Sequence, residues 1–233
     1  MENMFDKLLH LPLFQGVSHE RIKETIEKVP FHFLKFRKGE RIIDNGDPCT
    51  HVRFIISGRI LIEHESKALK FKISHELSAP EVIAPDYLFG LNTHYPFSAY
   101  ALEECGILQV AKQDYVAMLQ TDNVFLFNIL NYLSRNSQQR KNQLLSMHNA
   151  TVIERIVMLV SAFTSQRAAN ISLTFRQRDL CRLLGTRRPA FVSAVTYLEE
   201  NDLIEVPNNF TIIVKDRKAL LDELNNSYKR IQL

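Results

Sequence analysis

One stretch of the sequence, residues 173–204, constrains the fold most because it reads as two short amphipathic helices joined by a glycine. Thr174 and Gln177 have the spacing of a capping box, which predicts a first helix over residues 175–184. Gly185 follows the last apolar position of that helix, where a residue without Cβ takes the left-handed backbone that ends a helix. Two helices joined in this way form a helix-turn-helix.

The second helix of this pair is predicted to begin directly after the turn. Thr186 or Arg187 is its expected N-cap. Pro189 fits the first turn, where its missing N–H breaks no helical hydrogen bond. The inner face is apolar at helical spacing, with Phe191, Val195 and Leu198.

A short hairpin is predicted after the second helix. Pro207, Asn208 and Asn209 form a turn between two β-prone segments, and asparagine tolerates positive φ. This hairpin would form a wing beside the two helices.

The outward side of this region is strongly basic. Residues 176–188 contain five arginines and one acidic residue, a local balance of +4. Phosphates attract such a surface, and a recognition helix reads base edges with its N-terminal residues, so Arg188 is the expected base reader. The candidate DNA-binding residues are Arg176, Gln177, Arg178, Thr186, Arg187, Arg188, Pro189, Ser193, Asn208 and Asn209. A solvated basic face on an ordinary helical domain is the alternative, but it leaves the glycine turn, the caps and the wing as coincidences.

Length and charge divide the chain in two. Its 233 residues suffice for two domains, since single cores span about 50 to 200 residues. Residues 135–233 carry 15 Lys and Arg and 9 acidic residues, a net +6, whereas the earlier residues carry 14 and 17, a net −3. This asymmetry predicts a nucleic-acid-binding C-terminal half joined to a half with another task.

The remaining composition excludes several classes of protein. Cys49, Cys105 and Cys181 are odd in number and widely separated, so we interpret them as packed thiols rather than as a disulfide framework or a metal site. No signal peptide and no apolar run long enough to span a bilayer is recognisable. We therefore expect a cytoplasmic protein with no membrane partner.

The front of the chain is rich in turns and the back is not. Six of the eight prolines lie at or before Pro96, and six of the seven glycines precede residue 107, which predicts a β-rich front and a mainly helical back. Two short helices are expected at the N-terminus, the second capped by Ser18. Strands are expected at residues 31–36, 41–44, 52–56, 59–64, 69–74 and 106–110. Short strands at this spacing favour a compact sandwich or roll.

Glycine recurs at the strand connections of this front half, in GERI (39–42), NGD (45–47) and FIISGRI (54–60). This pattern resembles the β-roll of the Crp/Fnr regulators, and LLGTRRPAFVSAVTYLEENDLI resembles the C-terminal domain of that family. The resemblance covers most of the chain. It implies an α+β fold with an N-terminal antiparallel, cupin-like β-roll, flanking helices, a long dimerisation helix and a C-terminal winged helix-turn-helix. It also implies a homodimer on a palindromic DNA operator, with RNA polymerase as a further candidate partner.

A long helix is expected from Asp122 to about Met147, because this segment contains no glycine or proline. Positions recur along it at spacings of four and three, which is typical of a two-stranded coiled-coil seam, although the centre is polar. The seam residues are Leu126, Leu130, Leu133, Ser137, Arg140, Leu144 and Met147. The alternative is that this helix packs on its own β-roll.

Two further caps frame the C-terminal domain. Thr151 and Glu154 form a second capping box, and Asp216 is expected to cap a final helix. The expected domains are therefore a sensor at 1–120, a dimerisation helix and hinge at 121–149, and a DNA-binding domain at 150–233.

The sensor site is where the sequence departs from the resemblance. Relatives that bind cyclic nucleotides carry a cassette in which Glu bonds the ribose and Arg pairs with the phosphate. Here Phe97 stands in the arginine position and Ala84-Pro85 in the Gly-Glu position, so a phosphate would be desolvated without a charged partner. We expect no cyclic-nucleotide response and no cofactor, with the aromatic residues filling the site rather than lining a pocket for an uncharged ligand. The degenerate pocket would comprise Ala84, Pro85, Asp86, Leu88, Phe97, Ser98 and Ala99.

Other functions leave weaker signals. A haem sensor needs an axial ligand, for which His75, His94 or His148 could serve, and an iron–sulfur sensor needs clustered N-terminal cysteines, which the sequence lacks before Cys49. The sequence has no His-x-His pair of a β-roll metalloenzyme and no common catalytic motif, so we expect no metal site and no enzyme. A protein-binding scaffold is the third alternative.

Overall fold

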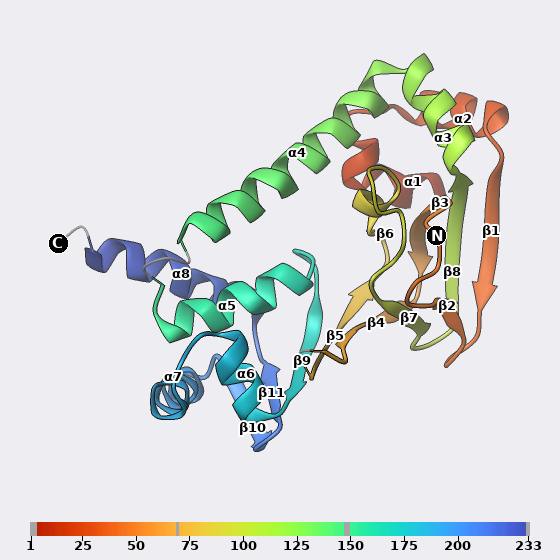
Figure 1. Cartoon of the computed structure of the whole chain (residues 1–233). Coiled ribbons are helices and arrows are strands. Elements are labelled where there is room, and N and C mark those ends of the chain that lie inside the picture. Colours follow the sequence, from red (N-terminus) through yellow and green to blue (C-terminus); the bar gives the residue numbers. More distant parts are fainter. Residues whose placement is uncertain (1–3, 69, 147–149, 232–233) are drawn as a thin grey trace. The chain divides into compact units, whose positions relative to one another are not determined.

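The structure is a computed structural model that describes residues 4–68, 70–146 and 150–231 (Figure 1). The chain forms two compact units. The first contains Met1–Leu61 and Leu77–Gln139, and the second contains Ile62–Glu76 and Arg140–Leu233. Residues 62–76, which lie inside the sensor segment expected from the sequence, therefore cluster with the C-terminal residues. The expected domain boundaries stay a prediction.

The first unit is built on antiparallel strands. A four-stranded sheet has the order β1-β8-β3-β6. Its strands are β1 (Phe31–Phe36), β3 (His51–Ser57), β6 (Glu81–Ile83) and β8 (Cys105–Ala111). Outside this four-stranded sheet, β2 (Arg41–Ile43) pairs with β7 (Ser98–Ala101). Apolar side chains of β3 and β8 fill the core, among them Phe54, Ile55, Ile107 and Leu108.

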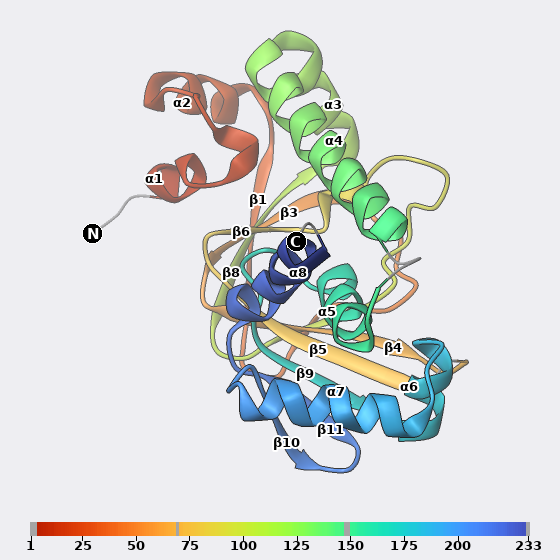
Figure 2. The ribbon, with the colours of Figure 1, turned by 90° about the vertical axis from the view of Figure 1, so that its left-hand side faces the viewer.

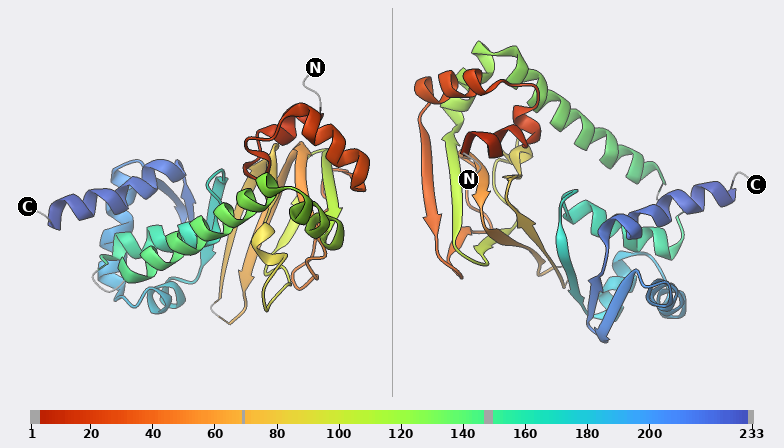
Figure 3. Two further views of the ribbon diagram at one scale, coloured as in Figure 1. Left: turned by 90° about the horizontal axis from the view of Figure 1, so that it is seen from above. Right: turned by 180° about the vertical axis from the view of Figure 1, so that it is seen from behind.

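Short helices flank these strands. They are α1 (Met4–Leu9), η1 (Pro12–Phe14), α2 (His19–Lys28), η2 (Pro85–Tyr87) and α3 (Lys112–Thr121). Helices α2 and α3 lie at the same end of the β1–β8 pair (Figure 3). Ser18 caps α2, as predicted, because its Oγ accepts a hydrogen bond from Arg21 N–H at 3.3 Å. The predicted long helix is α4 (Asn123–Ser146).

The second unit contains the predicted helix-turn-helix. Its helices are α5 (Val152–Phe163), α6 (Gln177–Leu183), α7 (Arg188–Glu200) and α8 (Arg217–Ile231). Its own strands are β9 (Ala169–Phe175), β10 (Ile204–Asn208) and β11 (Thr211–Val214). Most of the hairpin of β4 (Arg59–Ser66) and β5 (Phe71–Ser78) joins them, in the antiparallel order β10-β11-β9-β5. Helix α7 lies alongside the β10–β11 hairpin (Figure 2).

The predicted fold class, α+β with an N-terminal β-roll and a C-terminal winged helix-turn-helix, is confirmed. All six predicted strands are present, as β1 to β5 and β8. Asp216 caps α8, as predicted, by accepting from the N–H groups of Lys218 and Ala219. Within the described residues, every helix falls short of the length and apolar character needed to cross a membrane.

One local prediction is wrong. Thr174 does not cap α6 but lies in β9, opposite Thr211 of β11 and Lys72 of β5. Helix α6 begins at Gln177, with Arg176 as an N-cap that makes no side-chain cap bond. Pairing on both sides satisfies the backbone of β9 along its length, whereas a cap satisfies only one or two N–H groups, so the strand prevails.

Candidate nucleic-acid interface

Backbone hydrogen bonds close the turn between α6 and α7. Gly185 has φ +61°, in the left-handed region that glycine adopts without strain. The N–H of Thr186 donates to the carbonyl of Cys181 at 2.9 Å, and the N–H of Gly185 donates to that of Arg182 at 3.2 Å. This Schellman arrangement satisfies carbonyls that a helix end leaves free. The glycine turn predicted from the sequence is confirmed.

The side chain of Arg155 in α5 also hydrogen-bonds to the turn between α6 and α7. Its Nη1 donates to the carbonyl oxygens of Leu184 at 3.0 Å and Gly185 at 3.3 Å. Helix α5 starts at the predicted capping box of Thr151 and Glu154. Sequence reasoning missed Arg155, because the carbonyls that it reaches lie 29 and 30 residues away and leave no local pattern.

Helix α7 begins without a side-chain cap. Arg187, one of the two predicted candidates, is the N-cap, and Pro189 lies in the first turn. Uncapped N–H groups and the helix dipole favour an anion at this end. Ser193 Oγ donates to the carbonyl of Pro189 at 3.1 Å, so its proton is used within the helix and only acceptor lone pairs remain for another molecule.

The predicted basic residues lie on the surface of the two helix N-termini. Arg176, Arg178, Arg187 and Arg188 are exposed, and Gln177 and Thr186 are half-buried. The Nε of Arg178 lies 3.8 Å from the carboxylate of Asp179, but the Arg178 side chain is 78% exposed. Burial raises the pKa of the Cys181 thiol, and the positive charge of Arg188 opposes that rise. This arrangement offers exposed guanidinium groups beside an uncapped helix end.

The wing ends on exposed residues. Asn208 Oδ1 accepts from the N–H of Phe210 at 2.9 Å, and the N–H of Phe175 donates to the Phe210 carbonyl at 2.8 Å. Asn208 and Asn209 are exposed, and Phe210 is 58% exposed. The predicted hairpin is present as β10 and β11. Its turn was predicted one step too early, because Pro207 and Asn208 are the last residues of β10 and the turn lies at Asn209 and Phe210.

The predicted effector segment is packed with aromatic side chains. Phe97 is 2% exposed, and its ring centroid lies 5.4 Å from that of Tyr95 and 6.5 Å from that of Tyr87. Ala84 has φ +41°, and buried Pro85 opens η2. Leu88 and Ala99 are fully buried, and Asp86 and Ser98 are half-buried.

The polar groups around this segment bond to one another. Ser98 Oγ donates to Asp44 Oδ1 at 3.2 Å and accepts from the N–H of Asn45 at 3.2 Å. Arg41 Nη1 donates to the same Asp44 carboxylate at 2.5 Å. The Arg41 guanidinium is thus already paired with an acid.

All three cysteines are free and buried, as predicted. The thiol of Cys49 donates to Tyr95 Oη at 3.0 Å, and Arg53 Nη1 donates to the same oxygen at 3.3 Å. Burial raises the pKa of Cys49, Cys105 and Tyr95. These groups are packing residues of the first unit.

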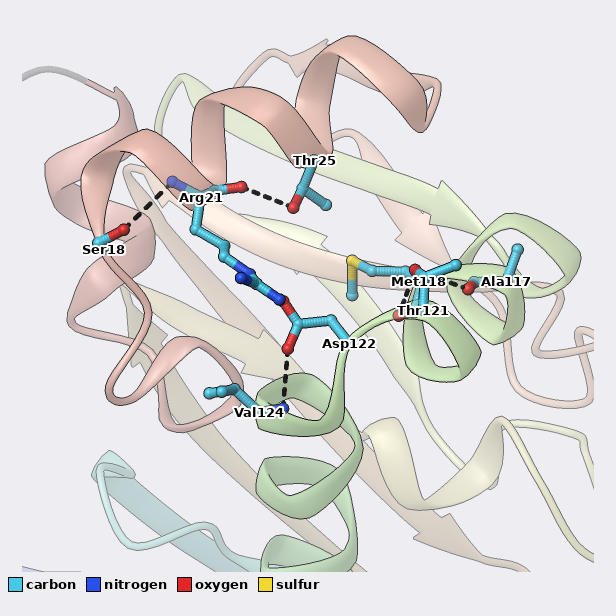
Figure 4. Close-up of polar contacts among 8 residues, drawn as sticks. All are labelled: Ser18, Arg21, Thr25, Ala117, Met118, Thr121, Asp122 and Val124. Carbon is cyan, nitrogen blue, oxygen red and sulfur yellow. Dashed lines mark hydrogen bonds and ion pairs between the residues drawn. The ribbon is translucent and has the colours of Figure 1, made fainter.

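A polar cluster fixes the first turn of α4 (Figure 4). Asp122, which is 7% exposed, accepts from Arg21 Nε at 2.6 Å and from the N–H of Val124 at 2.8 Å. The hydrogen bond to Asp122 raises the pKa of Arg21. Asn128 Nδ2 donates to two backbone carbonyls, those of Leu13 and Gln15. The start of α4 is therefore tied to the N-terminal helices.

Beyond this anchor, α4 carries apolar side chains at its surface. Leu130 is 47% exposed and Phe127 is 61% exposed. Leu126 and Leu133 are half-buried, and Ser137 is exposed. Three predicted seam residues are not covered by this description. Met147 lies outside the described residues, and the side chains of Arg140 and Leu144 lie outside them as well. Phe127 was missed because it does not fit the spacing of four and three that starts at Leu126.

The structure describes two of the three candidate haem ligands. His75 is 3% exposed in the second unit, His94 is exposed in the first, and His148 lies outside the described residues. Across residues 4–68, 70–146 and 150–231, no group of three His, Cys, Asp or Glu is arranged to hold a metal ion.

Comparison with known proteins agrees with this geometry. Residues 33–122 match the cyclic nucleotide-binding domain, and residues 144–223 match the Crp-like helix-turn-helix domain. The nitrogen fixation regulation protein FixK of Azorhizobium caulinodans is 24% identical over 145 residues, which are 58% of each chain. The chain thus spans about 58% of the length of that relative.

Two solved structures share the fold. The catabolite activator protein of Thermus thermophilus is 20% identical with a TM-score of 0.52, covering 91% of this chain and 97% of its own. The sensor domain of the transcriptional regulator DNR from Pseudomonas aeruginosa is also 20% identical, with a TM-score of 0.50, covering 58% of this chain and 89% of its own.

Proposed function

Because the chain belongs to the Crp/Fnr family of transcription regulators, and not to a family of enzymes, we propose that it binds a two-fold symmetric DNA operator as a homodimer. The observation that carries the proposal is the exposed arginine cluster at the uncapped N-terminus of α7. Arg188 would read a guanine, while Arg178 and Arg187 would hold phosphates. Such a protein works in the cytoplasm, with RNA polymerase as a further partner.

The wing and Ser193 complete the proposed surface. The exposed Asn208 and Asn209 would contact the DNA backbone beside the groove. The Ser193 hydroxyl donates within its own helix, so it would only accept from a base or a water. Ser193 is therefore a weaker contact in this proposal than Arg188.

The proposed dimer contact is the apolar surface of α4. Leu130 and Phe127 expose large side chains on a helix whose first turn is anchored by Asp122. Burying these side chains against the same helix of a second subunit would remove apolar area from water. Two recognition helices would then meet half-sites about 34 Å apart.

We also propose that cyclic AMP and cyclic GMP are not the effectors. Supporting this, Phe97 occupies the position of the phosphate-pairing arginine and is packed against Tyr87 and Tyr95. A phosphate there would lose its water and gain no charged partner, a cost of about 1 to 3 kcal/mol or more. Any regulation would then come from an apolar or neutral ligand, from haem, or from protein abundance alone.

Selection of genomic DNA fragments by the purified protein tests the function. We expect an inverted repeat to be enriched, with affinity that weakens as salt is raised. Arg188→Lys keeps the charge but loses the guanidinium fork, so it should lose operator affinity while its affinity for random DNA stays within about twofold. Arg135→Lys, a change on the exposed surface of α4, is the matched control. Equal affinity of the wild type for all fragments would contradict sequence-specific binding.

A further inference from the structure

The hairpin of residues 62–76 supplies a strand to the sheet that carries the wing. Strand β5 pairs with β9 from Phe71 opposite Phe175 to Glu76 opposite Ala169. The other edge of β9 pairs with β11. Strand β9 ends one residue before Arg176, the N-cap of α6. The hairpin therefore covers a strand edge that would otherwise present unpaired N–H and C=O groups directly beside the helix-turn-helix.

A line of aromatic rings runs from this hairpin to the recognition helix. Phe71 lies directly opposite Phe175, so the two side chains share one face of the sheet. The Phe175 ring meets that of Phe191 in α7 edge-on, with centroids 6.0 Å apart. All three residues are at most 6% exposed. Phe191 lies three residues after Arg188, in the next turn of α7. The packing of Phe191 against Phe175 therefore fixes the position of the helix turn that carries Arg188.

The hairpin also packs against the end of α5. The ring of Phe163, at the end of α5, lies 5.3 Å from that of Phe71 and 5.3 Å from that of His64, both edge-on. His64 in turn stacks on His75 at 6.2 Å. The hairpin is thus packed into the core of the second unit rather than laid on its surface.

We propose that the hairpin of residues 62–76 is a positioning element for the recognition helix. Docked on β9, it holds Phe175 and, through Phe175, Phe191 and the first turns of α7. The remaining residues of β4 and β5 belong to the first unit. The two strands therefore connect the first unit covalently to the hairpin that would position α7. This inference rests on the proposed function, because positioning matters only if α7 reads DNA.

Two variants test the proposal: Phe71→Ala weakens the packing of the hairpin on β9, and a cross-strand disulfide locks the hairpin onto β9. Phe71→Ala removes the ring that faces Phe175. Ser74→Cys with Ser172→Cys places thiols on residues directly opposite each other, at a separation that suits a disulfide. Phe33→Ala, which removes an exposed ring from β1 in the first unit, is the matched control.

The readout is the ratio of operator affinity to random-DNA affinity. We expect Phe71→Ala to lower the operator affinity about tenfold while random-DNA affinity and its salt dependence stay within about twofold, because phosphate contacts tolerate misplacement better than base contacts. The oxidised disulfide variant should keep wild-type operator affinity. Phe33→Ala should change neither affinity.

Three results would overturn the inference. Equal losses on both DNAs would show that Phe71 has only a structural role, and an unchanged operator affinity would show that the hairpin does not position α7. An oxidised disulfide variant that binds the operator only after reduction would mean that docking inhibits binding. If the wild type binds no operator, the proposed function fails instead. Amide exchange then decides the inference, since Phe71→Ala should speed exchange at residues 188–194 and unchanged protection would refute it.

Discussion

Lowering the pH should weaken the second unit through one histidine. His75 of β5 is 3% exposed, and its Nδ1 is buried without a hydrogen-bond partner. Burial is the largest cause that lowers its pKa from 6.5 to about 3, and the positive charges of His64 and Arg217 contribute to the same shift. Between these two values the unfolded chain binds a proton that the folded chain does not. Stability therefore falls as the pH falls through this window, and it is fully present above the unfolded value.

The size of the effect follows from the two pKa values. Near pH 5 the unfolded His75 is almost fully protonated, while the folded one, with a pKa of about 3, stays neutral. Each pKa unit corresponds to about 1.4 kcal/mol, so the step from pH 7 to pH 5 should cost about 2 kcal/mol of unfolding free energy. Replacing His75 with phenylalanine removes the titrating group and keeps a flat ring in the same space, so this loss should disappear.

Urea unfolding at both pH values measures the difference. Each protein is compared with itself at pH 7 and pH 5, so the carboxylates, which are common to both, cancel in the difference between wild type and His75→Phe. His94→Phe, which changes an exposed histidine of the first unit, is the control. Its unfolding free energy should fall between pH 7 and pH 5 by as much as that of the wild type. Hydrogen exchange of the β5 and β9 amides confines the readout to the second unit. Equal losses in wild type and His75→Phe would refute the reasoning.

Three further outcomes follow from the contacts described above. Arg155→Ala removes two hydrogen bonds to the turn before α7 and should lower the unfolding free energy by about 1 to 3 kcal/mol in urea titrations; no change would mean that water replaces both bonds. Leu130→Asp combined with Phe127→Asp should convert a dimer into monomers in sedimentation experiments, and a persisting dimer would place the contact elsewhere. Phe97→Arg should gain affinity for cyclic AMP in calorimetry, and no gain would mean that the cassette alignment or the packing argument is wrong.

Features governed by neighbouring residues were predictable from the sequence. The capping box of Thr151, the cap at Asp216 and the turn at Gly185 each depend on a few adjacent positions, and the structure contains all three. The long helix α4 was readable because a segment without glycine or proline can propagate over many turns. Arg187 and Arg188 are exposed as expected, because they lie outside the apolar stripe that forms the inner face of α7.

Features set by distant residues were not predictable in the same way. The reach of Arg155 to the turn carbonyls and the burial of His75 depend on segments that are far away in the chain. The strand β9 did leave a signal, because Ile171, Leu173 and Phe175 alternate with polar residues and are buried. The same segment also has the capping-box spacing, which favours an earlier start of α6 and gave the wrong prediction.

The two possible roles of Thr174, as a residue of β9 or as the N-cap of α6, suggest how the hairpin of residues 62–76 would position α7. Thr174 satisfies two local rules, one that extends β9 and one that would start α6 earlier, and the pairing with Lys72 and Thr211 selects the strand. Removing the β5 partner leaves only one paired edge, so the balance at Thr174 shifts toward the cap. A helix that began there would draw Phe175 into its first turn and away from Phe191. If the hairpin positions α7 as proposed, amide exchange at residues 174–177 in Phe71→Ala should be the first to change, and unchanged exchange there would contradict this account of Thr174.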